Sequence, residues 1–164
     1  MKTLTCLALA PLALLAACGP SVDVDEVTET LRLTETAHLD AIAAKDVDGI
    51  MKLYEDDAVV VVPGTEAVSG APAIRTYFQQ MVSDPNLTIE TTPGANWTGA
   101  AGDLAVTTYR ATFTHTDPQS GERRTVPMSN QTVWTKDTGS SWRIVSDYNV
   151  LLPDGAGEEV ASAR

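Results

Sequence analysis

One acidic residue near the end of the chain has the setting that acid–base chemistry requires. Asp147 lies in the stretch 142–151, which is largely apolar and alternates with the period of a β-strand. A carboxylate on such a strand is either an acid or base with a raised pKa or a hydrogen-bonded structural group. Tyr109, on the predicted strand 104–116, is the second catalytic candidate, because its hydroxyl can orient a bound molecule. The residues alone leave both roles of Asp147 open.

A ligand pocket needs apolar walls and a few polar groups, and one set of side chains offers both. These candidates are aromatic residues on the predicted strands and the polar residues beside them: Tyr54, Trp97, Tyr109, Phe113, Asp147, Tyr148 and Asn149. The alternative is that the aromatic residues only fill the core, since aromatic residues make up 5% of the chain. Pocket lining is therefore an expectation that the register of the strands must decide.

Several other kinds of site are disfavoured by the residues present. His38 and His115 lie on different predicted elements, and neither has a histidine four residues away, so we expect no metal site. Neither Ser69 nor Ser146 stands in a motif with a histidine, which argues against a nucleophilic triad. No glycine-rich phosphate loop is present and no cofactor is expected. The formal net charge of -11 argues against a nucleic-acid partner.

Two further arrangements of charged residues have a structural alternative. Asp56 and Asp57 precede the strand 58–62, and we expect them to cap the turn before it rather than to act as a base. Arg110 and Asp147 lie on strands of one predicted sheet, where they form either part of a water-activating site or an ion pair at the rim. Which of these holds depends on whether they share a face of the sheet.

The first residues of the chain predict export rather than a folded element. Lys2 is followed by an apolar run over 4–17, which is too short to span a membrane and has the length of a signal peptide core. The sequence Leu-Ala-Ala-Cys that ends at Cys18 resembles the bacterial lipobox, in which the cysteine is acylated and becomes the N-terminus. Gly19, rather than aspartate, follows Cys18, and this resemblance implies the outer membrane, facing the periplasm. Since Cys6 lies within the predicted leader, no disulfide or catalytic thiol is expected.

The remaining pattern predicts one α+β domain. Residues 18–24 are the predicted lipidated cysteine and tether, 25–152 the domain, and 153–164 a disordered tail. Helices are expected from Asp23, from Asp46 and from Ser69 or Gly70, with a strand over 58–62 that is buried on both faces. A meander of antiparallel strands follows over 87–97, 104–116, 123–136 and 142–151. Helices segregated on one face of a curved antiparallel sheet are typical of this order.

Three stretches together resemble a known superfamily. They are DVDGIMKLYEDDAVVVVPG at 46–64, SGAPAIRTYFQQM at 69–81 and TVWTKDTGSSWRIVSDYNV at 132–150. In order and spacing they are similar to the nuclear-transport-factor-2-like (NTF2-like) superfamily, specifically its SnoaL-like and DUF4440-type domains, over roughly residues 28–152. The resemblance implies a cone: a curved antiparallel sheet wrapped on three helices, with a pocket at the wide end. It also implies that Trp134 and Trp142 pack sheet against helix.

The resemblance implies a pocket but leaves the chemistry undecided. Isomerase-like relatives carry a base just after the first strand, where this chain has no carboxylate before Glu66. Histidines that relatives often carry on the last strand are replaced here by Ser146 and Tyr148. We therefore expect an envelope lipoprotein that binds a small apolar ligand or a partner, often as a homodimer through the exposed sheet face. The alternative is a cofactor-independent isomerase, cyclase or hydrolase, and a structural module is a third possibility.

Overall fold

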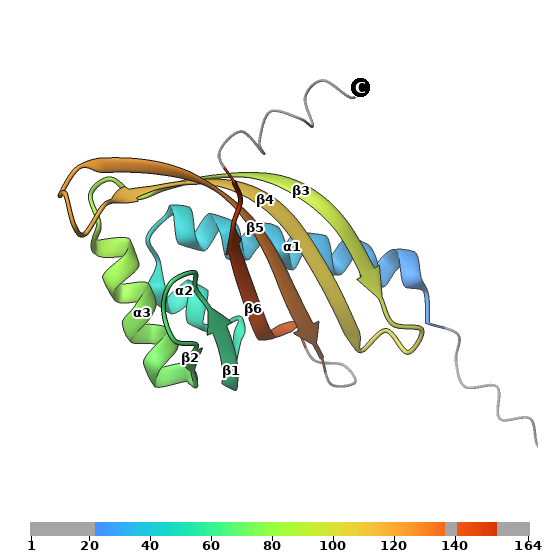
Figure 1. Ribbon diagram of the computed structural model, residues 1–164. Helices are drawn as coiled ribbons and strands as arrows, with labels where there is room; N and C mark the ends of the chain where they lie inside the picture. The colour runs from blue at the N-terminus through green and yellow to red at the C-terminus, as the bar shows by residue number, and fades with distance from the viewer. Residues whose placement is uncertain (1–21, 137–140, 154–164) are drawn as a thin grey trace, which may run out of the picture.

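A strongly curved sheet forms most of the domain, with helices on its concave side (Figure 1). The structure is a computed structural model that describes residues 22–136 and 141–153. The predicted leader, Cys18 and the tail from 154 onward lie outside the described residues. The elements are α1 (Val24–Ala43), α2 (Val47–Met51), β1 (Tyr54–Val61), β2 (Val68–Ser69), α3 (Ala71–Ser83), β3 (Thr88–Thr98), β4 (Leu104–Thr116), β5 (Arg123–Thr135) and β6 (Arg143–Leu151). The sheet order is β2-β1-β6-β5-β4-β3.

Helix α1 runs along the concave side of the sheet with one buried stripe. Its N-cap is Asp23, whose carboxylate accepts hydrogen bonds from the backbone N–H groups of Asp25 and Glu26. The buried residues recur three or four positions apart, which places them on one face: Leu31, Glu35, His38 and Ile42. Two of these four are polar, so α1 contributes ionisable groups as well as apolar surface to the interior.

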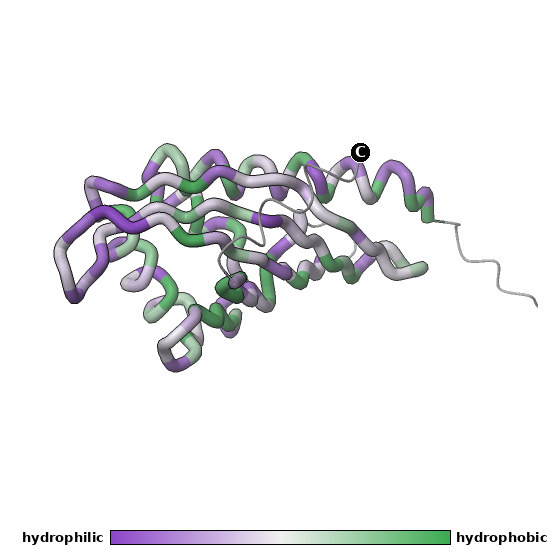
Figure 2. Tube along the Cα trace, turned by 45° about the horizontal axis from the view of Figure 1, so that its top comes forward, coloured by the Kyte–Doolittle hydropathy of each residue, from purple (hydrophilic) through white to green (hydrophobic). Residues whose placement is uncertain are grey.

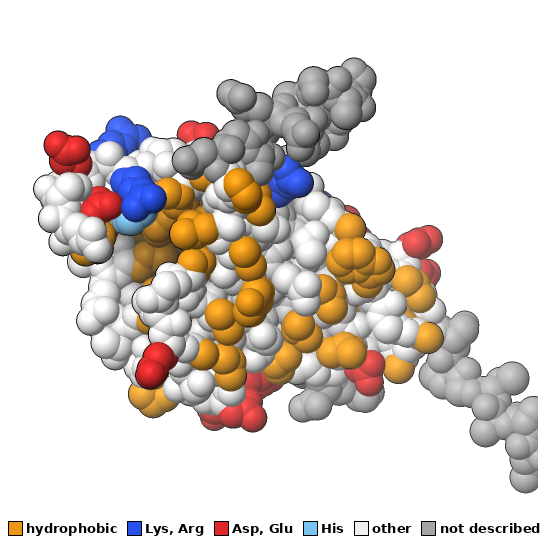
Figure 3. Space-filling model, in the orientation of Figure 1, with side chains coloured by type: hydrophobic (Ala, Val, Ile, Leu, Met, Phe, Trp, Pro, Cys, Tyr) orange, Lys and Arg blue, Asp and Glu red, His pale blue; other side chains and the backbone are white. Residues whose placement is uncertain are grey.

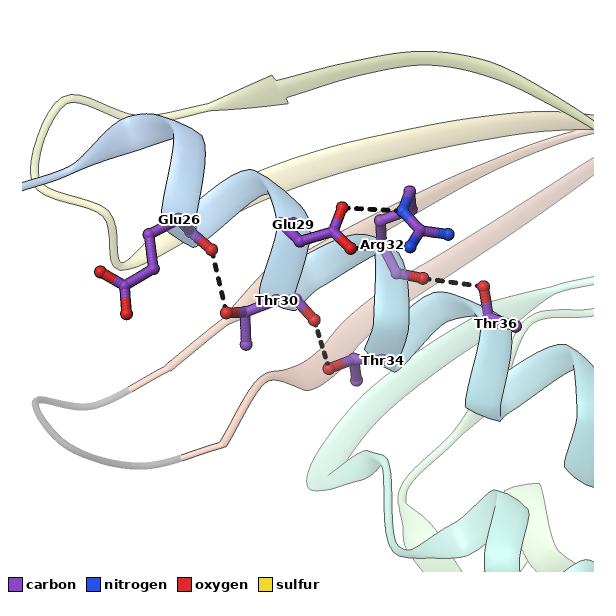
Figure 4. A network of polar contacts seen from close by, with 6 residues as sticks. All are labelled: Glu26, Glu29, Thr30, Arg32, Thr34 and Thr36. Atoms are coloured by element: carbon purple, nitrogen blue, oxygen red, sulfur yellow. Dashed lines mark hydrogen bonds and ion pairs between the residues drawn. The ribbon is translucent and has the colours of Figure 1, made fainter.

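The opposite face of α1 is polar, and its side chains form hydrogen bonds within the helix. The hydroxyls of Thr30, Thr34 and Thr36 each donate to the carbonyl four residues earlier, and Arg32 pairs with Glu29 at 2.7 Å (Figure 4). The trace of α1 accordingly alternates between hydrophobic and hydrophilic residues (Figure 2). This pattern is typical of a solvated helix face, because threonine hydroxyls in helices turn back to the preceding turn.

Strand β1 differs from its prediction in length and pairing. It begins at Tyr54, four residues before the predicted start, and pairs parallel with β6, so the sheet is mixed rather than wholly antiparallel. The register shifts between Tyr54 and Val59, and Asp56 and Asp57 lie exposed in this irregular part of the strand instead of capping a turn. Residues from Ala58 onward alternate between buried and half-buried, because only one face of β1 meets the core.

The other two helices close the concave side. Asp46 caps α2 by accepting a hydrogen bond from the Gly49 N–H at 2.9 Å. Gly70, with φ +83°, precedes α3, and Pro72 follows in its first turn, where a missing N–H costs no hydrogen bond. Ile74 and Phe78 turn the buried face of α3 toward the core. Within the described residues, no helix is long and apolar enough to cross a membrane.

The long strands give the sheet its curvature and leave one end open. Strands β4 and β5 pair over thirteen residues each and arch over the helices as one hairpin (Figure 1). The register of β3 on β4 shifts between Pro93 and Asn96, and a bulge of this kind bends a strand. The core lies at the near end of the hairpin, which is the end where β4 begins and β5 finishes. It surrounds Trp134, Trp142 and Ile144, each at most 1% exposed. The far end of the hairpin, where the turn joins β4 to β5, therefore extends beyond the packed core.

Candidate functional site

Strand register brings four polar side chains together on the concave face of the sheet. Asp147 pairs with Thr132 of β5, and Asn149 pairs with Asn130, one step further along the same face. Residues directly opposite each other in a sheet point to the same side. On this face the neighbouring residues of β4 are Thr107, opposite Thr132, and Tyr109, opposite Asn130.

Asp147 is the centre of this cluster and is only 5% exposed. Its Oδ1 accepts hydrogen bonds from the amides of Asn130 at 2.5 Å and Asn149 at 3.0 Å. Its Oδ2 accepts one from the Tyr54 hydroxyl at 2.7 Å. Among the described residues, three neutral donors and no cation contact the carboxylate, so it is hydrogen-bonded to dipoles rather than ion-paired. A carboxylate offers about four acceptor positions, which leaves capacity for one further donor.

The donors are themselves held in place by the surrounding strands. The Thr132 hydroxyl donates to Asn130 Oδ1 at 2.8 Å, which orients the amide so that its NH₂ faces Asp147. Asn149 also donates to the backbone carbonyl of Val61 at 3.3 Å, linking the cluster to β1. A buried network in which each amide is fixed by a second contact keeps the carboxylate in one position.

Tyr54 connects the cluster to a histidine on α1. The Tyr54 hydroxyl lies 3.4 Å from His38 Nε2, and both side chains are almost fully buried. Burial lowers the pKa of His38, although the charge of Asp147 acts against this shift, so a neutral imidazole is favoured. Because the Tyr54 proton points to Asp147, the contact fits the tautomer with hydrogen on Nε2. His38, Tyr54 and Asp147 then form one chain of hydrogen bonds.

The carboxylate lies at the floor of a cavity of about 500 Å³ between α3 and the far half of the β4–β5 hairpin. Figure 3 shows hydrophobic side chains gathered in the hollow beneath the hairpin. The walls include Val60, Tyr77, Phe78, Met81, Ile89, Tyr109, Phe113, Val126, Met128 and Leu151, with Asp147 and Asn149 among the polar residues. Towards the hairpin tip the lining adds His115 and Arg124. The cavity is thus apolar with a polar floor, as small-molecule sites commonly are.

Two phenols in the cavity wall are held in their neutral form. Burial, followed by the charge of Asp147, raises the pKa of Tyr77 to about 12. The same two causes raise the pKa of Tyr109 well above its usual range. At neutral pH both are therefore hydrogen-bond donors beside a carboxylate acceptor. This arrangement can accept a proton or hydrogen bond from a bound molecule at Asp147 and donate one from a phenol.

A second buried carboxyl lies on α1, deeper than the cavity. Glu35 is 7% exposed, and its Oε1 has no hydrogen-bond partner among the described residues. Burial raises the pKa of Glu35, and a hydrogen bond with Thr107 lowers it in part. Thr107 also accepts a hydrogen bond from the Trp134 indole at 2.9 Å. Glu35 is not part of the cavity lining, and its charge contributes to the raised pKa of Tyr109.

The family of the chain follows from its sequence match. The family model described as a SnoaL-like domain matches residues 36–145, which is more than half of the chain and runs from within α1 to the first residues of β6. The chain belongs to the SnoaL-like domain family. No curated protein sequence matches it.

Solved structures share the fold of this SnoaL-like domain at low sequence identity. A ketosteroid isomerase-like protein from Erwinia carotovora atroseptica has a TM-score of 0.69 and 16% identity, covering 79% of this chain and 98% of its own. A protein with a cystatin-like fold from Caulobacter vibrioides has a TM-score of 0.70 and 14% identity, covering 83% and 97%. An NTF2-like superfamily protein from Salmonella enterica has a TM-score of 0.65 and 18% identity, covering 82% and 98%. At this identity the likeness shows the NTF2-like fold alone.

The SnoaL-like domain places the predicted pocket residues in three different settings. Tyr109, Phe113, Asp147 and Asn149 line the cavity. Tyr54 lies behind its floor, buried in the core, and reaches the cavity only through Asp147. Trp97 and Tyr148 do not line it and are 58% and 49% exposed, because they pair with Val106 and Gln131 on the convex face. Alternation along a strand places residues one position apart on opposite faces, which separates Tyr148 from Asp147.

The same alternation decides the pairing of Arg110 and Asp147. Arg110 pairs with Ser129, whereas Asp147 pairs with Thr132, an odd number of residues away on β5. The two side chains therefore lie on opposite faces of the sheet and do not form a common site. Within the described residues, no three His, Cys, Asp or Glu side chains gather as a metal site would require.

Sequence reasoning missed three members of the site. Asn130 has no apolar context that distinguishes it from the other polar residues of β5. Tyr77 follows the apolar period of α3, and its hydroxyl contacts Met81 Sδ at 3.7 Å beside the cavity. His38 occupies a core-facing position of α1, and its spacing from Leu31 and Ile42 is the signal that it is buried. Only the fold shows that this histidine meets Tyr54.

Proposed function

We propose that this chain is a bacterial envelope lipoprotein whose SnoaL-like domain binds a small apolar ligand that carries a hydrogen-bond donor. The observation that carries the proposal is Asp147, a carboxylate at the floor of an apolar cavity that has no ion-pair partner within the part of the chain that the structure describes. An apolar molecule fills the walls, and its donor takes the remaining acceptor position of the carboxylate. A second copy is the partner we propose in addition, bound through the part of the convex face around Tyr148 and Val150 of β6, which are 49% and 42% exposed.

Paired probes that differ only in their donor test the ligand class. We expect 2-naphthol to bind about tenfold more tightly than 2-methoxynaphthalene, because a hydrogen bond to a charged group contributes about 1.5–3 kcal/mol. Asp147→Asn should bring the two dissociation constants close together, as measured by calorimetry. Phe113→Leu, which changes only the apolar wall, should weaken both probes equally and keep their ratio. An unchanged ratio in Asp147→Asn contradicts the assignment of the carboxylate.

The anchor is proposed from Cys18, which the lipobox resemblance marks for acylation. Cys18→Ala should abolish the acyl mass and release the protein from the membrane fraction, because stable attachment needs more than one buried acyl chain. Cys6→Ala is the matched control and should change neither, since Cys6 lies in the part of the leader that is removed. Membrane fractionation with intact-mass measurement decides between the two. Unchanged membrane association of Cys18→Ala contradicts the anchor.

A second candidate function is proton transfer of the isomerase type. The observation that favours it is that Asp147 and the neutral phenols of Tyr77 and Tyr109 line the same cavity. In such a reaction the carboxylate takes a proton from the carbon next to a carbonyl, a phenol donates to the carbonyl oxygen, and the carboxylate returns the proton to the ligand. Deuterium exchange from D₂O into a cyclic enone, followed by NMR, tests it. Exchange no faster than in buffer leaves the domain as a binder.

A further inference from the structure

The end of the domain opposite the cavity carries a cluster of exposed apolar side chains. It consists of Val22 and Val24 at the start of α1, Trp97 near the end of β3 and Leu104 at the start of β4. Each is between 38% and 58% exposed. Figure 3 shows hydrophobic side chains near the point where the N-terminal trace leaves the domain. We call this cluster the proximal face.

The proximal face is a fixed part of the fold and not a loose end. Val22 packs against the turn between β3 and β4 so closely that a Cβ on Gly102 would lie 2.5 Å from its Cγ1. The turn is closed by the hydrogen bonds Gly99 N–H to Leu104 O and Gly102 N–H to Gly99 O, both 2.8 Å. Thr28 of α1 lies 3.4 Å from Thr98 of β3 through their hydroxyls. The start of α1 is therefore held against the turn.

Chain length ties this face to the proposed anchor. Val22 is four residues after Cys18, and four residues span at most about 14 Å. The headgroup region of one leaflet is about 5–7 Å deep. A cysteine with its acyl chains in the bilayer therefore brings the proximal face to the lipid surface.

We propose that the proximal face rests on the bilayer to which Cys18 is anchored, with Trp97 and Leu104 in the interfacial layer. The inference rests on the proposed lipidation. Tryptophan is the side chain best suited to this layer, because its large ring is apolar and its indole N–H can meet water or headgroups. Asp25, Glu26 and Asp103 lie in or near the same end, so the surface it fits is zwitterionic rather than anionic.

This orientation sets the direction from which a ligand arrives. Ile42, near the other end of α1, lines the cavity and lies about 27 Å along the helix from Val24. The lining continues to Thr116, Pro118 and Arg124 at the hairpin tip, the part of the sheet farthest from the turn between β3 and β4. The cavity thus opens away from the bilayer, and its ligand enters from the aqueous side.

The tryptophans of the chain provide the test. Trp134 and Trp142 are at most 1% exposed, so Trp97 is the tryptophan that a surrounding medium can reach. The full chain, purified from membranes, is placed in phosphatidylcholine–phosphatidylethanolamine vesicles with lipids brominated near the top of the acyl chain. We expect quenching of Trp97 emission at least about twofold stronger than for Cys18→Ala with the same vesicles, and reduced quenching when anionic lipid is added. Trp97→Phe should remove the quenchable signal.

Matched variants and a chemical lipid attachment distinguish failure of the bilayer contact from failure of the anchor proposal. Leu104→Ser should reduce the quenching, whereas Leu33→Ser on the side of α1, which is 55% exposed against 50% for Leu104, should not. Quenching by aqueous acrylamide that is the same for anchored and soluble protein overturns the proposal. If intact mass shows no acylation, the anchor proposal fails. The thiol of Cys18 is then coupled to a maleimide phospholipid, in a Cys6→Ser background. The same quenching measurement then tests whether the proximal face contacts the bilayer, independently of natural acylation.

Discussion

Asp147 and Glu35 are both buried carboxyls on the concave side of the sheet, yet their hydrogen-bond surroundings differ. Asp147 has a tyrosine and two amides as donors and borders the cavity. Glu35 has one oxygen without a partner among the described residues, and burial raises its pKa. Burial disfavours the charged form of a carboxyl, and the hydrogen bond with Thr107 offsets this only in part at Glu35. Glu35 is therefore the carboxyl whose surroundings penalise the charged form.

Glu35→Gln is expected to stabilise the protein near neutral pH by about 1 kcal/mol, because the amide keeps the shape and the contact with Thr107 without a buried charge. A raised folded pKa means that the contribution of Glu35 is fully present below pH 4.5 and is lost as pH rises. The gain should thus shrink in acid. Urea unfolding at both pH values, at an unchanged m-value, measures it. A loss of stability near neutral pH would show that the ionised carboxylate has a partner.

The site could be predicted from the sequence as far as side-chain type allowed. Asp147, Asn149 and Tyr109 follow from polar groups on strands with an apolar period, and the structure places them at one cavity. Trp97 and Tyr148 were predicted on the same grounds but lie on the convex face. Composition names the residues suited to a pocket, whereas the face on which each lies depends on register, which a single-residue shift inverts.

At the scale of elements, local signals predicted well and long-range pairings did not. The strand predicted over 104–116 is β4 with the same ends, because a turn bounds it on each side. The parallel pairing of β1 with β6 joins segments almost ninety residues apart and has no local signature. Glycine inside a helix lowers its stability, but a Cβ on Gly49 of α2 would lie 2.5 Å from the carboxylate of the capping residue Asp46. The close approach of the Asp46 carboxylate therefore requires glycine at this position.

Strand β3 offers a test of how the sheet bends. A Cβ on Gly94 would lie 2.4 Å from the Thr108 hydroxyl and 2.9 Å from the Thr108 carbonyl oxygen. We expect Gly94→Ala to cost about 1–3 kcal/mol, since the strands are forced apart next to the bulge. Adding Thr108→Ala should restore only part of this, because the carbonyl remains. Thermal unfolding of the single and double variants measures it, and full recovery in the double variant would place the whole clash at the hydroxyl.

At the scale of the whole molecule, core and cavity occupy different ends of one curved sheet. Trp134 and Trp142 pack the near half, and the far half of the hairpin holds the cavity open against α3. One contact across the mouth supports this arrangement: the Asp84 carboxylate at the end of α3 accepts hydrogen bonds from the Thr116 N–H and hydroxyl at 2.6 Å. An open pocket is thus kept by polar contacts at its edge, while apolar packing elsewhere supplies stability.

The buried phenols link the charge of the site to the stability of the whole domain at alkaline pH. Burial and the charge of Asp147 raise the pKa of Tyr77 to about 12, and the pKa values of Tyr54 and Tyr109 lie well above their usual range. A folded pKa raised above the unfolded value of 10.0 gives stability that is fully present below pH 10. It is lost as pH rises towards 12, because the unfolded chain releases protons that the folded chain retains.

We therefore expect the free energy of unfolding to fall above pH 10, and phenolate absorbance from these residues to appear together with the loss of near-ultraviolet circular dichroism. Tyr77→Phe should make the fall less steep, since one of the retained protons is absent. Asp147→Asn removes the second cause of the raised pKa and should let Tyr77 and Tyr109 ionise at lower pH. Ionisation of these phenols near pH 10 in a protein that stays folded would contradict the role of Asp147 as a charged group facing the cavity.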